Sequence, residues 1–219
     1  MKRLFSILLI IVGLSSISKG QINLSVFGAA SIPSGNFSDY YSTAFGFRGN
    51  ISYSTSNDVQ FFLHSGYNVW KFNNDKYNDA FHSSGGVGTF NLEIPITAIP
   101  LLLGTRFSLT YRRYTKVYAE VAGGFYLITT NASGKYSDNT GTYDLGFEKK
   151  NYTEFTVHIG GGTIFPLYKK LNIDAGVFFD LITDSEAAKQ AKSSKNAKDY
   201  YDASTVKTFV FCLGLNYQF

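Results

Sequence analysis

The sequence predicts an all-β fold, an eight-stranded antiparallel up-and-down transmembrane β-barrel with a polar interior and a lipid-facing apolar exterior. Large apolar residues alternate with small or polar ones in eight segments, the last of which ends the chain on Phe219. The connections between these segments are alternately short and long. Because successive side chains of a strand point to opposite faces, this pattern is typical of strands in a closed barrel that faces lipid.

The first twenty residues predict a signal peptide rather than a part of the fold. Lys2 and Arg3 precede an apolar run over 5–14 that is too short to span a membrane as a helix. Ser18 and Gly20 then give the small-x-small pattern that precedes a cleavage site.

Cleavage before Gln21 divides the chain into a signal peptide, residues 1–20, and a single barrel domain, residues 21–219. Because Gln21 is not a cysteine, a lipid-anchored lipoprotein is disfavoured. The leader carries three basic residues and no acidic one, so its removal lowers the net charge from +4 to +1. This balance gives no case for nucleic-acid binding. Cys212 is the single cysteine, which excludes an intramolecular disulfide and favours a reduced packing role.

The first four predicted strands are about 22–32, 43–54, 59–71 and 88–109. Their large side chains share one face, which comprises Leu24, Val26, Ala30 and Ile32; Phe45, Phe47, Ile51 and Tyr53; Val59, Phe61, Leu63, Tyr67 and Val69; and Leu101, Leu103, Thr105, Phe107 and Leu109. Pro95 and Pro100 interrupt the fourth segment, and proline is confined to strand edges, starts or bulges. We therefore expect 88–98 to extend this strand beyond the membrane, with a bulge or break near Pro100.

The last four predicted strands are about 117–129, 153–165, 171–182 and 209–219. Their apolar face comprises Val117, Ala119, Val121, Phe125 and Leu127; Phe155, Val157, Ile159 and Phe165; Leu171, Ile173, Ala175, Val177, Phe179 and Leu181; and Phe209, Phe211, Leu213, Leu215, Tyr217 and Phe219. No segment after the leader reaches the run of about 18 apolar residues that a spanning helix needs. Only helices and closed barrels satisfy the backbone in lipid, and the even number of strands suits a bacterial barrel.

The connections differ in length on the two sides of the predicted barrel. The short ones are 55–58, 110–116 and 166–170, and the long ones are about 33–42, 72–87, 130–151 and 183–204. Short periplasmic turns alternate with long outer loops in outer-membrane barrels, which places both chain ends on the periplasmic side. In the last loop Lys189, Lys192, Lys195 and Lys198 recur at every third position. They form a basic rim that touches lipopolysaccharide phosphates or an ordinary solvated loop whose acidic residues cancel the charge.

A soluble β-sandwich or a lipocalin-like barrel would show the same alternation with its apolar face turned inward. Alternation alone does not say which face points in. The terminal Phe219, the predicted leader and the sorted loop lengths favour the barrel with its apolar face outward.

Ionisable side chains fall on the predicted inner face and are expected to form a polar network in the lumen: Arg48, His64, Arg106, Glu120, Glu154, His158, Asp174 and Asp180. Side chains fill the interior of an eight-stranded barrel, and an unpaired buried charge costs about 3–5 kcal/mol, so these charges must pair. Arg106 and Glu120 lie symmetrically about Arg113, so a regular hairpin makes them cross-strand neighbours. The network fills the lumen or, alternatively, lines a gated conductance.

Candidate catalytic residues are few. His64 and Ser65 are adjacent, so on a strand they point to opposite faces and cannot form a nucleophile–base pair. His82 and Ser84 lie two apart in a predicted outer loop, which is a weak signal for such a pair. His64 and His158 fall on strands far apart around the barrel, so we expect no metal site. No cofactor motif is present.

Several short motifs connect the sequence to a known family: Phe27-Gly28-Ala29-Ala30, Pro33-Ser34-Gly35-Asn36-Phe37, Ile99-Pro100-Leu101-Leu102-Leu103, Gly123-Gly124, Gly160-Gly161-Gly162 and the final Leu213-Gly214-Leu215-Asn216-Tyr217-Gln218-Phe219. With them the chain resembles small eight-stranded outer-membrane barrels of the OmpA/OmpX type, and most of all the porin-like outer-membrane β-barrel family of Bacteroidota. The terminal motif resembles the signal that the outer-membrane assembly machinery reads, carried here by Phe211, Leu213, Leu215, Tyr217 and Phe219. The resemblance implies a fold and a location and no agreed activity.

We expect an integral outer-membrane protein with a structural or adhesive role through its outer loops and no catalysis. A narrow channel or small-ligand carrier is the first alternative, and a lipid A-modifying enzyme is the second. The expected partners are outer-membrane lipid, lipopolysaccharide and the assembly machinery, without nucleic acid. The chain is expected to be a monomer in the cell outer membrane.

Overall fold

The computed structural model describes residues 21–35, 37–56, 58–111, 115–146, 149–183 and 205–219. The predicted leader, the lysine-rich loop over 184–203 and Arg113 lie outside the described residues. The elements are β1 (Gln21–Ser34), α2 (Phe37–Tyr40), β2 (Ala44–Ser54), β3 (Val59–Trp70), α3 (Asn74–Ser83), β4 (Thr89–Glu93), β5 (Ile96–Tyr111), β6 (Thr115–Thr130), β7 (Ser133–Asp138), β8 (Gly141–Leu145), β9 (Lys150–Tyr168), β10 (Leu171–Thr183) and β11 (Thr205–Gln218).

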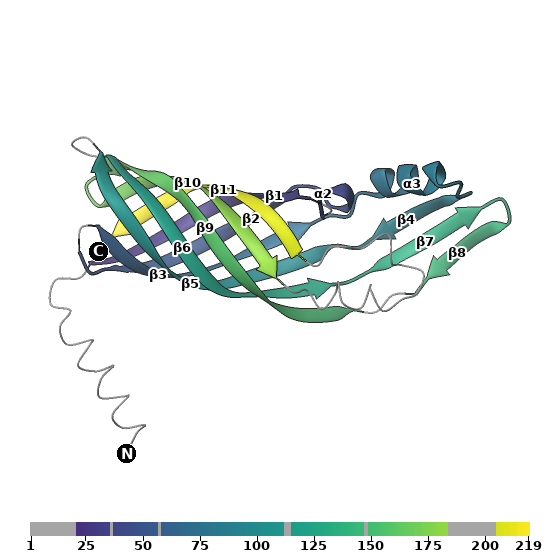
Figure 1. The fold of residues 1–219 in the computed structure, drawn as a ribbon, viewed down its shortest axis with the longest axis horizontal. Helices are drawn as coiled ribbons and strands as arrows, with labels where there is room; N and C mark the ends of the chain where they lie inside the picture. The colour runs from purple at the N-terminus through teal and green to yellow at the C-terminus, as the bar shows by residue number, and fades with distance from the viewer. Residues whose placement is uncertain (1–20, 36, 57, 112–114, 147–148, 184–204) are drawn as a thin grey trace, which may run out of the picture.

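Eight of the described strands close into an antiparallel barrel in the order β1-β11-β10-β9-β6-β5-β3-β2 (Figure 1). The first and last strands pair over most of their length, from Asn23 opposite Gln218 to Ser34 opposite Lys207. The predicted fold class is therefore confirmed. Closure leaves no unpaired strand edge in the barrel wall.

The apolar face of every barrel strand points outward, as predicted. Phe211, Leu213 and Leu215 are 45%, 63% and 49% exposed, whereas Arg106 and Glu120 are both 3% exposed. This arrangement excludes the soluble alternatives, in which the apolar face would fill the interior. Large apolar side chains also enter the lumen from the polar face, and the alternation did not single them out; they include Phe62, Trp70, Leu102, Phe178 and Ile182.

The prediction that 88–98 extends the fourth strand is confirmed only for residues 96–98, because β5 begins at Ile96. Residues 89–93 form β4, which pairs with β7 in a separate three-stranded sheet of order β4-β7-β8. Pro95 lies between β4 and β5, where its missing backbone N–H breaks neither sheet. At Pro100 the register of β5 is unbroken against β6, and the ladder to β3 is interrupted without a shift.

The turn predicted over 166–170 is shorter in the structure. Pro166 stays in β9 opposite Asn172, and the register shifts by one residue between Leu171 and Asn172. This bulge accommodates the missing proline N–H. Lys169 completes the turn with a φ of 46°. The predicted end of this strand at residue 165 is therefore three residues short.

All the elements outside the barrel lie at one end of it, opposite the end that holds the C-terminus (Figure 1). The β4-β7-β8 sheet and α3 project from this outer end, and α2 lies beside the outer part of β1. The long connections predicted at 72–87 and 130–151 thus contain regular elements, which are helix α3 in the first and strands β7 and β8 in the second. The end with the short turns and the C-terminus is called the periplasmic end and the opposite end the outer end, after the orientation expected from the loop lengths.

Candidate functional site

The lumen contains a continuous chain of buried ionic groups that begins at Arg48 on β2. Its Nη2 donates to Asp180 Oδ2 at 2.7 Å and to Tyr126 Oη at 3.0 Å. Tyr126 Oη in turn donates to Asp180 at 2.5 Å. The second oxygen of Asp180 contacts His158 Nδ1. Asp180 is therefore the point where groups from three other strands meet.

The ionic chain continues from His158 toward the periplasmic end. His158 Nε2 lies 3.1 Å from Glu120 Oε1, and Arg106 Nε donates to Glu120 Oε2 at 2.7 Å. Arg106 Nη1 donates to Asp174 at 3.1 Å, and Tyr118 Oη donates to the other oxygen of Asp174 at 2.7 Å. The Arg106 guanidinium also lies 3.8 Å above the Tyr118 ring, which adds a cation–π contact.

The hydrogen-bond pattern favours a charged His158. Ionised carboxylates only accept hydrogen bonds, and both ring nitrogens of His158 face one. Both contacts are hydrogen bonds when the ring is an imidazolium. Three cations, Arg48, Arg106 and His158, then oppose the three carboxylates of the chain, which offsets the cost of burying them.

The structure unites six of the eight predicted lumen residues in this chain. Arg106 and Glu120 are direct cross-strand partners, as their spacing predicted. His64 packs beside the chain, with its ring centroid 5.8 Å from that of His158. Glu154 is buried on β9 as the cross-strand partner of Tyr126. Tyr118 and Tyr126 share the inward phase of Glu120 on β6, but the predicted lumen network did not include them.

Aromatic side chains close the outer end of the lumen. Phe37 of α2 stacks on Tyr41 at 4.6 Å and meets the edge of Trp70 at 5.8 Å. This cluster also contains Tyr126 and Ile182 from the barrel wall, so it sits directly above the ionic chain. At the periplasmic end, amide and hydroxyl side chains leave a space of only about 80 Å³. Side chains of the described residues therefore occupy the lumen along the ionic chain and at both of its ends.

Replacing Arg106 with methionine is expected to lower the free energy of unfolding by about 2–3 kcal/mol. The change removes charge-assisted hydrogen bonds to Glu120 and Asp174. Within the ionic chain, Glu120 then keeps His158 as its partner and Asp174 keeps Tyr118. Urea unfolding in lipid vesicles and heat-modified gel mobility would measure it. Lys135→Met is the control, because the Lys135 side chain is 62% exposed and its ion pair with Asp144 spans 3.7 Å. Equal stability of the two variants would contradict the prediction.

The candidate catalytic pair is not assembled. His82 Nε2 lies 2.6 Å from Gly88 O, and Ser84 Oγ donates to Phe81 O at 2.7 Å. Each side chain is thus engaged with the backbone of its own loop. Among the described residues, no group of three or more His, Cys, Asp or Glu side chains is arranged so that it could hold a metal ion.

No helix in the described part of the chain has the length and apolar character needed to cross a membrane.

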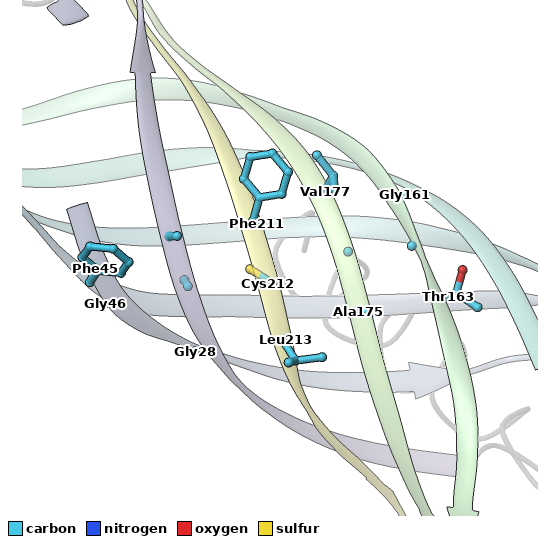
Figure 2. Close-up of a pocket in the computed structure, with 14 residues that line it drawn as sticks. Gly28, Phe45, Gly46, Gly161, Thr163, Ala175, Val177, Phe211, Cys212 and Leu213 are labelled. Carbon is cyan, nitrogen blue, oxygen red and sulfur yellow. The ribbon is translucent and has the colours of Figure 1, made fainter. Parts of the chain in front are cut away.

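The outer wall of the barrel has a shallow hollow of about 770 Å³ at mid-height. Figure 2 shows it crossing β2, β1, β11, β10 and β9, with Phe211 and Leu213 standing on β11 at its centre. It forms because Gly28, Gly161 and Ala175 replace the large outward side chains found elsewhere on the wall. Its lining is mainly apolar, so it suits an apolar ligand such as an acyl chain.

One edge of the outer sheet is closed by side chains of α3. Asn74 bonds both backbone groups of Leu92, as donor to its O and acceptor from its N, at 2.7 Å each. Asn78 does the same with Phe90 at 2.8 Å. Residues four apart on a helix share a face, and here they match alternate residues of β4. The two amides therefore replace a neighbouring strand.

The other edge of this sheet is β8. Its residues 141–144 are exposed, and no described strand pairs with its free side. The hairpin that presents β8 is held by Asp138, whose carboxylate accepts from the Thr140 hydroxyl at 2.5 Å and amide at 2.7 Å. These bonds, led by the one from the Thr140 side chain, hold the pKa of Asp138 below its ordinary value. A row of rings crosses the sheet, from Phe90 through Tyr136 to Tyr143.

No known protein family and no curated relative matches the chain. Among solved structures, a major outer membrane protein from Thermus thermophilus is similar at 13% identity with a TM-score of 0.52, covering 90% of this chain and 99% of that one. Neisserial surface protein A is similar at 14% identity and a TM-score of 0.48, covering 92% and 98%. Ail, the attachment invasion locus protein of Yersinia pestis, is similar at 15% identity and a TM-score of 0.43, covering 91% and 97%.

At these identities the likeness shows the fold alone, that of small outer-membrane β-barrels. It gives no support to the finer resemblance to a Bacteroidota family, which stays a prediction.

Proposed function

We propose that the protein is an integral outer-membrane barrel with a structural or adhesive role through its outer elements and no catalysis. The observation that carries this proposal is the contrast between the two parts of the molecule. The lumen is filled by an ionic chain and closed by aromatic side chains. The outer sheet projects from the barrel, and no described strand pairs with the outer side of β8, which can contact other molecules.

The proposed location follows from the outward apolar band and from the likeness to outer-membrane barrels. Acyl chains of membrane lipid would cover this band and fill the hollow beside β11, and lipopolysaccharide would surround the outer rim. The assembly machinery would read the terminal strand through Phe211, Leu213, Leu215, Tyr217 and Phe219. We propose a monomer within its own membrane, a member of the Bacteroidota porin-like family.

The test combines location with attachment. Outer-membrane fractions are expected to contain a protein whose gel mobility changes on heating, as a folded barrel's does. Cells that display the chain are expected to attach to surfaces or to one another more than cells without it. Loss of this gain after protease treatment of intact cells would point to the outer elements. A heat-insensitive protein in the soluble fraction would overturn the location, and attachment equal to that of control cells would overturn the role.

A narrow channel or a carrier of a small ligand is the alternative role, and conductance separates it from the first. We expect purified protein in planar bilayers to give no discrete current steps, because Phe37, Tyr41 and Trp70 block the outer end above the ionic chain. Trp70→Ala is expected to stay silent as well, since Arg48, Asp180 and the chain below still fill the lumen. Regular current steps from the wild type would favour the channel.

A lipid A-modifying enzyme is the third possibility, and lipid analysis after expression tests it. His82 and Ser84 give it no support, because each side chain bonds a backbone oxygen of its own loop.

A further inference from the structure

We propose that β8 pairs with β8 of a second copy carried on a facing membrane, so that two outer sheets join into one antiparallel sheet. The inference rests on the proposed function, because it requires the outer sheet to face away from the cell. It names the partner of that sheet as the same chain.

The two edges of the outer sheet are treated differently, which points to β8 as the contact. The β4 edge is closed by Asn74 and Asn78, whereas no described strand pairs with the free side of β8, whose main protection is its length of five residues. It contains neither lysine nor proline. Its one charge, Asp144, already faces Lys135 of β7 at 3.7 Å. An exposed edge of this kind is a template for strand addition.

The sequence of β8 is self-complementary in an antiparallel pair centred on Tyr143. The two Tyr143 side chains then lie opposite each other, and Thr142 of each copy lies opposite Asp144 of the other, to which its hydroxyl can donate. In the hairpin Tyr136 faces Tyr143 and Ser137 faces Thr142. Because hydrogen-bonded and non-bonded pairs alternate along the two-residue hairpin, the backbone groups of Thr142 and Asp144 point to the free edge.

The same register extends the row of rings across both copies. Within one copy Phe90 and Tyr136 have centroids 4.8 Å apart, and Tyr136 and Tyr143 stack at 6.4 Å. A two-fold axis perpendicular to the sheet relates the two copies and leaves their ring-bearing faces on the same side of the joined sheet. The rows therefore meet at the Tyr143 pair, and aromatic cross-strand pairs stabilise sheets.

The direction of the hairpin selects a copy on a facing membrane. β7 and β8 run along the long axis of the molecule at the end remote from the barrel (Figure 1). Two copies in one membrane point the same way, so their β8 strands would be parallel. A two-fold axis along the strands would also turn the Tyr143 faces to opposite sides. Copies on facing membranes are antiparallel, which agrees with a monomer within each membrane.

A single contact of this size is weak, because β8 has only five residues. Small interfaces bind transiently. Many copies on two apposed surfaces act together, and this multivalency raises the avidity without any new contact. The inference therefore concerns attachment between surfaces rather than a stable dimer in dilute solution.

The test uses the full chain in vesicles with the outer end outward, labelled in two colours. Wild-type vesicles are expected to cluster with one another and not with protein-free vesicles. Tyr143→Lys and Tyr143→Glu each place like charges opposite each other, so each is expected to lower clustering at least tenfold. Mixing Tyr143→Lys vesicles with Tyr143→Glu vesicles is expected to restore it, because the pair is then complementary.

Thr89→Lys is the matched control, since it adds the same charge to an exposed site on the closed-edge strand β4 and is expected to cluster like wild type. Wild-type vesicles that do not cluster, clustering that both Tyr143 variants leave unchanged, or a mixture that fails to recover would each overturn self-pairing. Attachment of displaying cells to a foreign surface is measured separately. If cells attach there and vesicles do not cluster, self-pairing fails and the proposed function stands.

Discussion

Replacing Asp180 with alanine is expected to lower the free energy of unfolding by about 3–5 kcal/mol, the cost of leaving a buried charge without its partner. Asp180 is fully buried and accepts from Arg48 and Tyr126 while contacting His158. Its loss leaves Arg48, also fully buried, with the Tyr126 hydroxyl as its one hydrogen-bond partner among the described residues. Urea unfolding in lipid vesicles measures the change. Trp70, the single tryptophan, lies in the adjoining aromatic cluster and reports it by fluorescence.

Two further variants separate the buried charge from side-chain loss in general. Asp144→Ala removes an aspartate whose side chain is 86% exposed and is expected to change stability by less than about 0.5 kcal/mol. Arg48→Met combined with Asp180→Leu replaces the pair by apolar groups and is expected to recover most of the lost stability. If Asp180→Ala unfolds like wild type, the ionic chain does not stabilise the barrel.

The faces of the barrel strands could be predicted because side chains alternate strictly and lipid imposes one rule on every outward position. Arg48, Arg106, Glu120 and Asp180 were placed inside by phase alone. The Arg106–Glu120 pair also followed from the sequence, since their hairpin is regular and pairing within it is local. Contacts between strands distant in the sequence, such as Arg48 with Asp180, depend on barrel closure and could not be derived from phase.

The outer elements were harder to predict, because their partners are distant in the sequence and lie outside the lipid. β4 was assigned to the neighbouring barrel strand, yet it pairs with β7 and with two asparagines of α3. Asn74 and Asn78 were visible four residues apart, but nothing in that spacing indicated a strand edge as their target. The contact by which Phe37 closes the lumen could not be predicted either, because α2 has four residues and is too short to show a helical pattern in the sequence.

Replacing Gly124 with alanine is expected to destabilise the barrel by about 3 kcal/mol or more, at the upper end of the cost of overpacking a core. Gly124 points inward on β6 opposite Leu102 of β5. A Cβ there would lie 2.1 Å from Leu101 O and 2.9 Å from Leu102 Cα. Both are backbone atoms held in the β5–β6 ladder, so relief requires the two strands to separate.

The preceding residue provides the control within the same dipeptide. A Cβ on Gly123, which points outward, would have its nearest neighbours, Phe155 Cζ and Thr156 O, at 3.9 Å. Gly123→Ala is therefore expected to be neutral or slightly stabilising, because alanine restricts the unfolded chain. The heat-resistant fraction on gels and urea midpoints in vesicles would compare the two variants. Equal losses of stability in the two variants would mean that the dipeptide is needed for backbone flexibility. A loss at Gly124 alone would show that the close approach of β5 to β6 requires a residue without a side chain at this position.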